Sequence, residues 1–132
     1  MAGLAEIYRD LLDAEGYRPT IDGDGDVAFK FEGGSYYISI YENDERYFQL
    51  VFPAFWSIDS PEELERARTA CIETTQTVKS TKVFLIRNNT DVSASYEAFY
   101  ASPDDVMKVF PRCIGSIQTA ASTFRDAMRK EG

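Results

Sequence analysis

The stretch VAFKFEGGSYYISIYENDERYFQLVFPAFWSI, residues 27–58, decides the fold of this chain. Apolar and polar residues alternate through three short segments of it, at residues 27–32, 36–41 and 47–52. A period of two places alternate side chains on opposite faces of a β-sheet, so each segment is expected to be a strand. The turns between them are short, and the strands are therefore expected to pair antiparallel as a meander. One face should carry the fold through Phe29, Phe31, Ile38, Ile40, Phe48 and Leu50.

The segments outside the meander predict three helices. Residues 3–15 repeat apolar side chains at helical spacing, and Gly16 suits a helix end. The second helix, to about residue 79, opens at Ser60-Pro61-Glu62-Glu63, where Ser60 should be the N-cap and Glu63 should complete a capping box. The third runs from about residue 102 to about 129, with a kink or a separate first turn expected at Pro111. The apolar stripe of the second helix is thin: Leu64, Ala67, Cys71, Ile72, Thr75 and Val78.

Three further strands complete the prediction. Residues 17–21 form a short first strand, and residues 82–87 and 92–100 form a hairpin. The segment 82–87 is apolar on both faces, which is typical of a central strand or one covered on both sides. The element order is α-β-β-β-β-α-β-β-α. The expected class is α+β, with a meander and a hairpin forming one antiparallel sheet packed with three helices, as a single domain over residues 1–132.

Composition excludes several chemistries. The chain has 132 residues, no histidine and a net charge of −8. Without histidine it cannot build a Ser-His-Asp or Cys-His pair, or a histidine-ligated metal site. The acidity disfavours nucleic acid and anionic membranes as partners, and we interpret it as a solubility feature, with an acidic face for a basic partner as the alternative. No signal peptide and no membrane-spanning run is recognisable, and no disulfide framework is expected, so the expected compartment is the cytoplasm.

No motif predicts a catalytic, cofactor or metal site. Asp22-x-Asp24-x-Asp26 has the spacing that begins an EF-hand loop. However, the sixth position is Val27 where glycine is needed, and the twelfth is Gly33 where glutamate is needed. We therefore interpret the segment as a hairpin turn. Cys71 and Cys113 lie on helical stripes, and we interpret both as small core residues.

The tyrosines suggest a contact surface. Tyr37, Tyr41 and Tyr47 fall on the strand face opposite the apolar set. Tyrosine is common at protein interfaces, because its ring buries a large apolar area while its hydroxyl stays hydrogen-bonded. Alternatively, these rings line a partly hydrated second side of the core, or each ring is exposed singly. Trp56 completes the candidate interaction surface, although Phe55 and Trp56 could instead form a core plug between a strand and a helix.

Several short motifs together carry a resemblance to a known family: Glu15-Gly16-Tyr17-Arg18-Pro19, the following Asp-Gly turn with Phe29-Lys30-Phe31-Glu32-Gly33, Tyr47-Phe48, Pro53-x-Phe55-Trp56, Lys82-Val83 and Glu97-x-Phe99. In these motifs the chain resembles the YbjN family of bacterial sensory transduction regulators. The resemblance implies a helix–sheet domain similar in fold to type III secretion chaperones. It also implies a domain without a catalytic site, often a homodimer, that acts through protein contacts.

The expected function is therefore a non-enzymatic protein-interaction or chaperone-like regulatory module of a bacterial cytoplasm, forming a homodimer and binding a protein partner. The alternative is a sensor domain that binds a small apolar or aromatic ligand against Tyr37, Tyr41, Tyr47 or Trp56. Neither expectation involves a cofactor.

Overall fold

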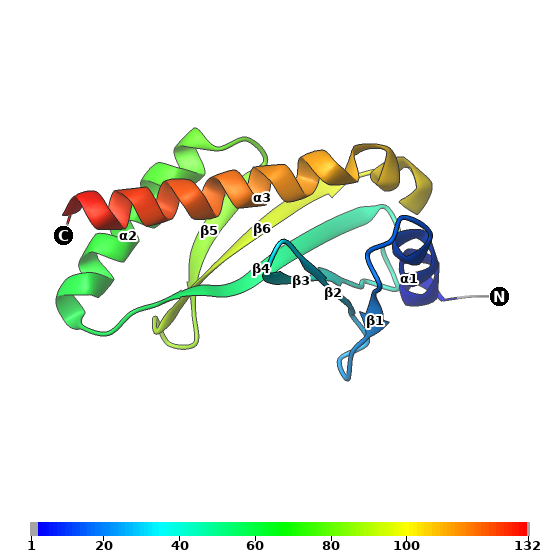
Figure 1. The fold of residues 1–132 in the computed structure, drawn as a ribbon, viewed down its shortest axis with the longest axis horizontal. Coiled ribbons are helices and arrows are strands. Elements are labelled where there is room, and N and C mark those ends of the chain that lie inside the picture. Colours follow the sequence, from blue (N-terminus) through cyan, green and yellow to red (C-terminus); the bar gives the residue numbers. More distant parts are fainter. Residues whose placement is uncertain (1–2, 132) are drawn as a thin grey trace.

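The computed structural model describes residues 3–131, which fold into three helices and one six-stranded antiparallel sheet (Figure 1). In chain order the elements are α1 (Leu4–Ala14), β1 (Thr20–Ile21), β2 (Val27–Phe31), β3 (Gly34–Ser39), β4 (Tyr47–Ser57), α2 (Pro61–Thr77), β5 (Thr81–Ile86), β6 (Asp91–Phe99) and α3 (Pro103–Glu131). The α+β class and the predicted order of helices and strands are confirmed.

The sheet has the strand order β1-β2-β3-β4-β6-β5. The meander pairs as predicted, with Ile38 of β3 opposite Val27 of β2 and Leu50 of β4. Of the two alternatives for residues 82–87, a central strand is wrong, because β6 lies between β4 and β5 and leaves β5 at the edge. Helix α2 covers part of that edge, where Thr75 Oγ1 accepts a 2.9 Å hydrogen bond from the Val83 N–H. Val83 of β5 is buried in the core on the helix side and Leu85 packs against that core, whereas Phe84 and Ile86 alternate to the opposite face.

Two strands differ in extent from the prediction. The first strand is limited to Thr20–Ile21, because Pro19 has no N–H to donate and Arg18 adopts a positive φ of 53°. Strand β4 instead runs on through Pro53 to Ser57, with a register shift between Phe52 and Trp56. Such an irregularity leaves a residue unpaired and bends the strand.

The three helices cover one face of the sheet and enclose the core. Figure 1 shows α3 along the length of the molecule, with α2 beside its C-terminal half and α1 near its first turns. The predicted apolar stripe of α3 is buried throughout: Val106, Phe110, Ile114, Ile117, Ala121, Phe124 and Met128. These side chains pack with the apolar set of the meander, most of which is also buried. Burial of such side chains supplies the main stabilising term of the fold.

The ends and stripes of the helices show smaller differences. Ser60 Oγ accepts from the Glu63 N–H at 3.1 Å, as predicted, but the Glu63 carboxylate accepts from the Asp59 N–H instead of completing the box at Ser60. On α2, Ala67 and Cys71 of the predicted stripe are buried, but Ile72 is 60% exposed and Thr75 is also exposed, and the helix buries Ala70 and Thr74 in their place. Helix α3 is continuous through Pro111, and Figure 1 shows its first turns bent away from the rest of its axis.

Candidate interaction surface on the uncovered face of the sheet

The face of the sheet opposite the helices carries a mixed aromatic and polar set of side chains. The register places Tyr37, Val51, Ser95 and Lys82 side by side across four strands. One step along the strands, Gln49 pairs with Glu97, and one step further Tyr47 pairs with Phe99. Helices cover the alternate side chains of the same strands, so these residues share the uncovered face.

Three rings form what we call the aromatic row: Tyr41, Tyr47 and Phe99. The ring centroids of Tyr41 and Tyr47 are 5.1 Å apart, and those of Tyr47 and Phe99 are 5.6 Å apart. Phe99 is 75% exposed and Tyr41 is 41% exposed. Single exposed apolar residues are ordinary, but here two exposed rings flank the half-buried ring of Tyr47 and form a patch of the kind that marks a contact surface.

Glu97 lies at the centre of a hydrogen-bond network beside the aromatic row. Its Oε2 atom accepts from Ser95 Oγ at 2.7 Å and from Gln49 Nε2 at 2.9 Å, and pairs with Lys82 Nζ at 2.8 Å. Gln49 Oε1 in turn accepts from the hydroxyl of Tyr41 at 3.1 Å. The network fixes Gln49 and Tyr41 in one arrangement, so the row is held by the sheet beneath it.

The network also sets the charge of Glu97. Burial alone would raise the pKa of this carboxyl, but hydrogen bonds from Lys82, Ser95, Gln49 and Tyr47 outweigh burial and lower the pKa to about 2. Glu97 is therefore ionised at neutral pH. Burial, together with the negative charge of Glu97, raises the pKa of Tyr47, so its phenol stays protonated and remains a donor.

The structure brings three of the four predicted surface residues together. Tyr37 and Tyr47 lie on the uncovered face, as expected, and Tyr41 contacts Tyr47 at its end. Trp56 lies on the helix side instead, where its Nε1 donates to Glu63 Oε2 at 3.1 Å and its ring lies 5.6 Å from that of Phe124. For Trp56 the core-plug interpretation describes the structure, so this residue does not share a surface with the tyrosines.

Sequence reasoning missed Glu97, Gln49, Lys82 and Phe99 as members of this surface. Alternation along residues 92–99 does place Glu97 and Phe99 on one face, since they are two positions apart. The missing information was the pairing of β4 with β6, which sets Phe99 opposite Tyr47. The two strands are separated in sequence by a helix and another strand, and local patterning does not specify such a pairing.

The Asp22–Asp26 segment forms a hairpin turn between β1 and β2, as interpreted from the sequence. Asp22 Oδ1 accepts from the N–H groups of Asp24 and Asp26 at 2.9 and 3.0 Å. Asp26 Oδ1 accepts from the Ile40 N–H at 2.8 Å, which ties the turn to the end of β3.

Across residues 3–131, no cluster of three or more acidic or cysteine side chains is arranged to hold a metal ion. Nor does any helix in this range have the length and apolarity that crossing a bilayer requires.

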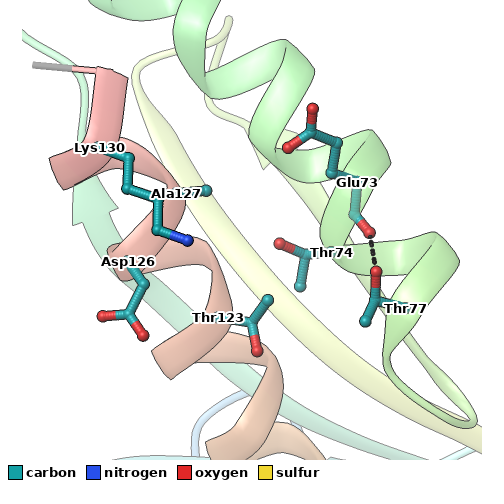
Figure 2. A pocket seen from close by; sticks show the side chains of 7 residues that line it. All are labelled: Glu73, Thr74, Thr77, Thr123, Asp126, Ala127 and Lys130. Carbon is teal, nitrogen blue, oxygen red and sulfur yellow. Dashed lines mark hydrogen bonds between the residues drawn. The ribbon is translucent and has the colours of Figure 1, made fainter.

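A hollow of about 280 Å³ lies between α2 and α3, a feature that sequence reasoning did not anticipate (Figure 2). Its lining consists of Glu73, Thr74, Thr77, Thr123, Asp126, Ala127 and Lys130. Figure 2 shows the ammonium of Lys130 and the hydroxyl of Thr74 facing each other across it. Thr74 Oγ1 is buried and has no hydrogen-bond partner within residues 3–131. The lining is polar, which suits a polar ligand better than the aromatic ligand expected from the sequence.

Both cysteines are buried, as predicted. Burial raises the pKa of the Cys71 thiol to about 11 and also raises that of Cys113. A raised pKa keeps both sulfurs as thiols at neutral pH, and the thiol is the unreactive form.

The fold is shared with two solved structures. YbjN from E. coli, described as a putative transcription regulator, superposes with a TM-score of 0.69 over 98% of this chain and 94% of its own, at 12% sequence identity. An uncharacterized protein from Methanothermobacter thermautotrophicus superposes with a TM-score of 0.56 over 97% of this chain and 98% of its own, at 13% identity. The sequence matches no family model and no curated protein. The resemblance to YbjN is thus confirmed at the level of the fold.

Proposed function

We propose that this protein is a non-enzymatic regulatory module that binds another protein through the uncovered face of its sheet, with the aromatic row as the contact. The exposed ring of Phe99 beside Tyr47 carries the proposal, because folding leaves a large apolar side chain in water where a partner could bury it. A cytoplasmic location, a chaperone-like role and a homodimeric state, all expected from the sequence, belong to the same proposal.

The available chemistry supports a module without catalysis. The chain has no histidine, and burial holds the pKa of both thiols above the ordinary range. Glu97 is engaged by several donors, and its lowered pKa makes it a poor proton acceptor near neutral pH. The side chains of the face are thus arranged to hold one another in place, which suits a preorganised binding surface.

A pull-down with matched variants tests the proposal. The immobilised wild type, Phe99→Ser and Ile72→Ser are each incubated with extract of the native host. Ile72 is also an exposed apolar residue, at 60%, but it lies on α2 on the helix side. We expect proteins retained by the wild type and by Ile72→Ser to be lost from Phe99→Ser. Equal retention by all three would contradict the proposal, as would a turnover activity that survives purification.

The hollow between α2 and α3 favours a second candidate, a small-ligand sensor. Its support is the buried hydroxyl of Thr74, which lines the hollow and has no hydrogen-bond partner among residues 3–131. Trp56 contacts both surrounding helices, through Glu63 of α2 and Phe124 of α3, so its fluorescence should respond to binding between them. A metabolite that shifts Trp56 emission in the wild type, but not in Thr74→Val, would establish this candidate. No shift across a panel of polar metabolites would count against it.

A further inference from the structure

Most of the excess negative charge of the chain is concentrated in two loops. The turn at residues 22–26 and the loop at residues 40–46, together called the acidic loops, contain six carboxylates and one guanidinium. Their net charge is −5, against −8 for the whole chain. An evenly spread solubility charge would not produce this concentration, so the loops create a strongly negative potential at one end of the sheet.

The acidic loops lie beside the aromatic row. Asp26 Oδ1 accepts a hydrogen bond from the N–H of Ile40, the residue directly before Tyr41. The Asp44 carbonyl accepts from the Tyr47 N–H at 3.1 Å. After burial, the charges of Asp26 and Asp22 contribute to the raised pKa of Tyr37, and Asp44 contributes to that of Tyr47. The negative potential of the loops therefore reaches Tyr47 of the aromatic row and Tyr37 beside it.

The other end of the same face already carries its own cations. Lys82 Nζ pairs with Glu97 and lies 5.4 Å from the ring centroid of Phe84, and Arg87 pairs with Asp91. Within residues 3–131 no comparable cation lies over a ring of the aromatic row, and Asp22, Asp24 and Asp44 form no ion pair. The ion pairs of Lys82 and Arg87 thus neutralise the face at β5 and β6, whereas the acidic loops beside the rings contain six carboxylates and Arg46 as their one cation.

We infer that the aromatic row and the acidic loops together bind a basic, arginine-containing segment of a partner protein. This inference rests on the proposed function and adds the chemistry of the partner. A guanidinium can stack on an exposed ring while its N–H groups meet a neighbouring carboxylate. Each cation–ring contact at an exposed site strengthens binding by a factor of about two to five. The potential of the loops also speeds the approach of a basic chain.

Fluorescence anisotropy with fluorescein-labelled nona-arginine, at low and physiological salt, tests the inference. We expect saturable binding that Phe99→Ser weakens by about two- to fivefold. Asp44→Asn should also weaken binding, whereas Glu73→Gln, which removes one charge from exposed α2, should not. Nona-lysine should bind less tightly than nona-arginine, because an ammonium stacks less well on a ring than a guanidinium does.

Three results would overturn the inference. The first is that nona-arginine does not bind. The second is that it binds equally to the wild type and Phe99→Ser, which would show attraction by net charge alone. The third is that sedimentation equilibrium shows a dimer that Phe99→Ser dissociates, which would assign the row to a second copy of the chain. If Phe99→Ser still loses its partner in the pull-down while nona-arginine fails to bind, the proposed function stands and only the basic partner is refuted. If the pull-down does not depend on Phe99, the proposed function fails, whatever the peptide does.

Discussion

Replacing Glu97 by glutamine tests whether the polar network holds the uncovered face together. The amide keeps one acceptor oxygen but carries no charge, whereas Ser95, Gln49 and Lys82 all interact with the charged Oε2 atom of Glu97. Lys82 is half exposed and can turn to water, but the Ser95 hydroxyl is buried and loses a charged acceptor. Replacing a charged acceptor by a neutral one weakens each hydrogen bond by about 1 kcal/mol, and the loss of a partly exposed ion pair adds up to about 1 kcal/mol.

We therefore expect Glu97→Gln to lower the free energy of unfolding by about 2 kcal/mol at pH 7. For a domain of this size, that loss lowers Tm by roughly 5–10 °C. Urea unfolding followed by circular dichroism measures the difference. Glu65→Gln is the control, because it breaks an exposed pair with Arg68 and should change stability by less than about 0.5 kcal/mol.

The effect has a definite pH dependence. The pKa of Glu97 in the folded protein is about 2, below its ordinary value of 4.5. A carboxyl with a lowered folded pKa stabilises the protein fully above 4.5, and this stabilisation is lost as the pH falls from 4.5 towards 2. Glutamine does not titrate, so the gap between wild type and Glu97→Gln should narrow by more than half between pH 7 and pH 3. A variant as stable as the wild type at pH 7, or a gap that stays constant on acidification, would refute this reasoning.

Three further predictions address the core, the thiols and nucleic acid. Phe48→Ala should lower the free energy of unfolding by about 3–5 kcal/mol, measured by urea unfolding, because the buried ring of Phe48 contacts Tyr8 and Phe110. Phe99→Ser should lower it by less than about 0.5 kcal/mol, and similar losses for the two variants would contradict the assignment of the two faces. Cys71 and Cys113 should resist a thiol reagent at pH 8 until urea unfolds the chain, and fast labelling of the folded protein would show that one is accessible. A labelled DNA duplex should show no anisotropy change at physiological salt, because the chain carries a net charge of −8, and saturable binding would disprove this.

The fold could be predicted from the sequence where local patterning decides it. Alternation over residues 27–52 specified the faces of β2, β3 and β4, and helical spacing specified the buried stripe of α3. The edge position of β5 could not be predicted, because the same apolar sequence fits a strand with a neighbouring strand on both edges and a strand with a helix against one edge. Here Thr75 of α2 takes up the Val83 N–H, and that contact depends on tertiary packing.

The candidate site was predicted only in part. Three tyrosines were placed on the correct face by alternation, but Trp56 was assigned to the same surface although it lies an even number of residues from Phe48 and Phe52. The register shift adds two residues to β4 between Phe52 and Trp56, so Trp56, opposite Val92, stays on the helix side with Phe52, opposite Ala94. Phe99 was missed because its exposure depends on the absence of a helix over that face.

Photo-crosslinking in the native host tests the central claim most directly. The photoreactive amino acid p-benzoylphenylalanine is placed at position 99 in one variant and at position 72 in another, since both native side chains are exposed but lie on opposite sides of the molecule. The proposed surface predicts a covalent adduct with a partner protein from position 99 and none from position 72. Adducts from position 72 alone, or equally from both positions, would contradict it.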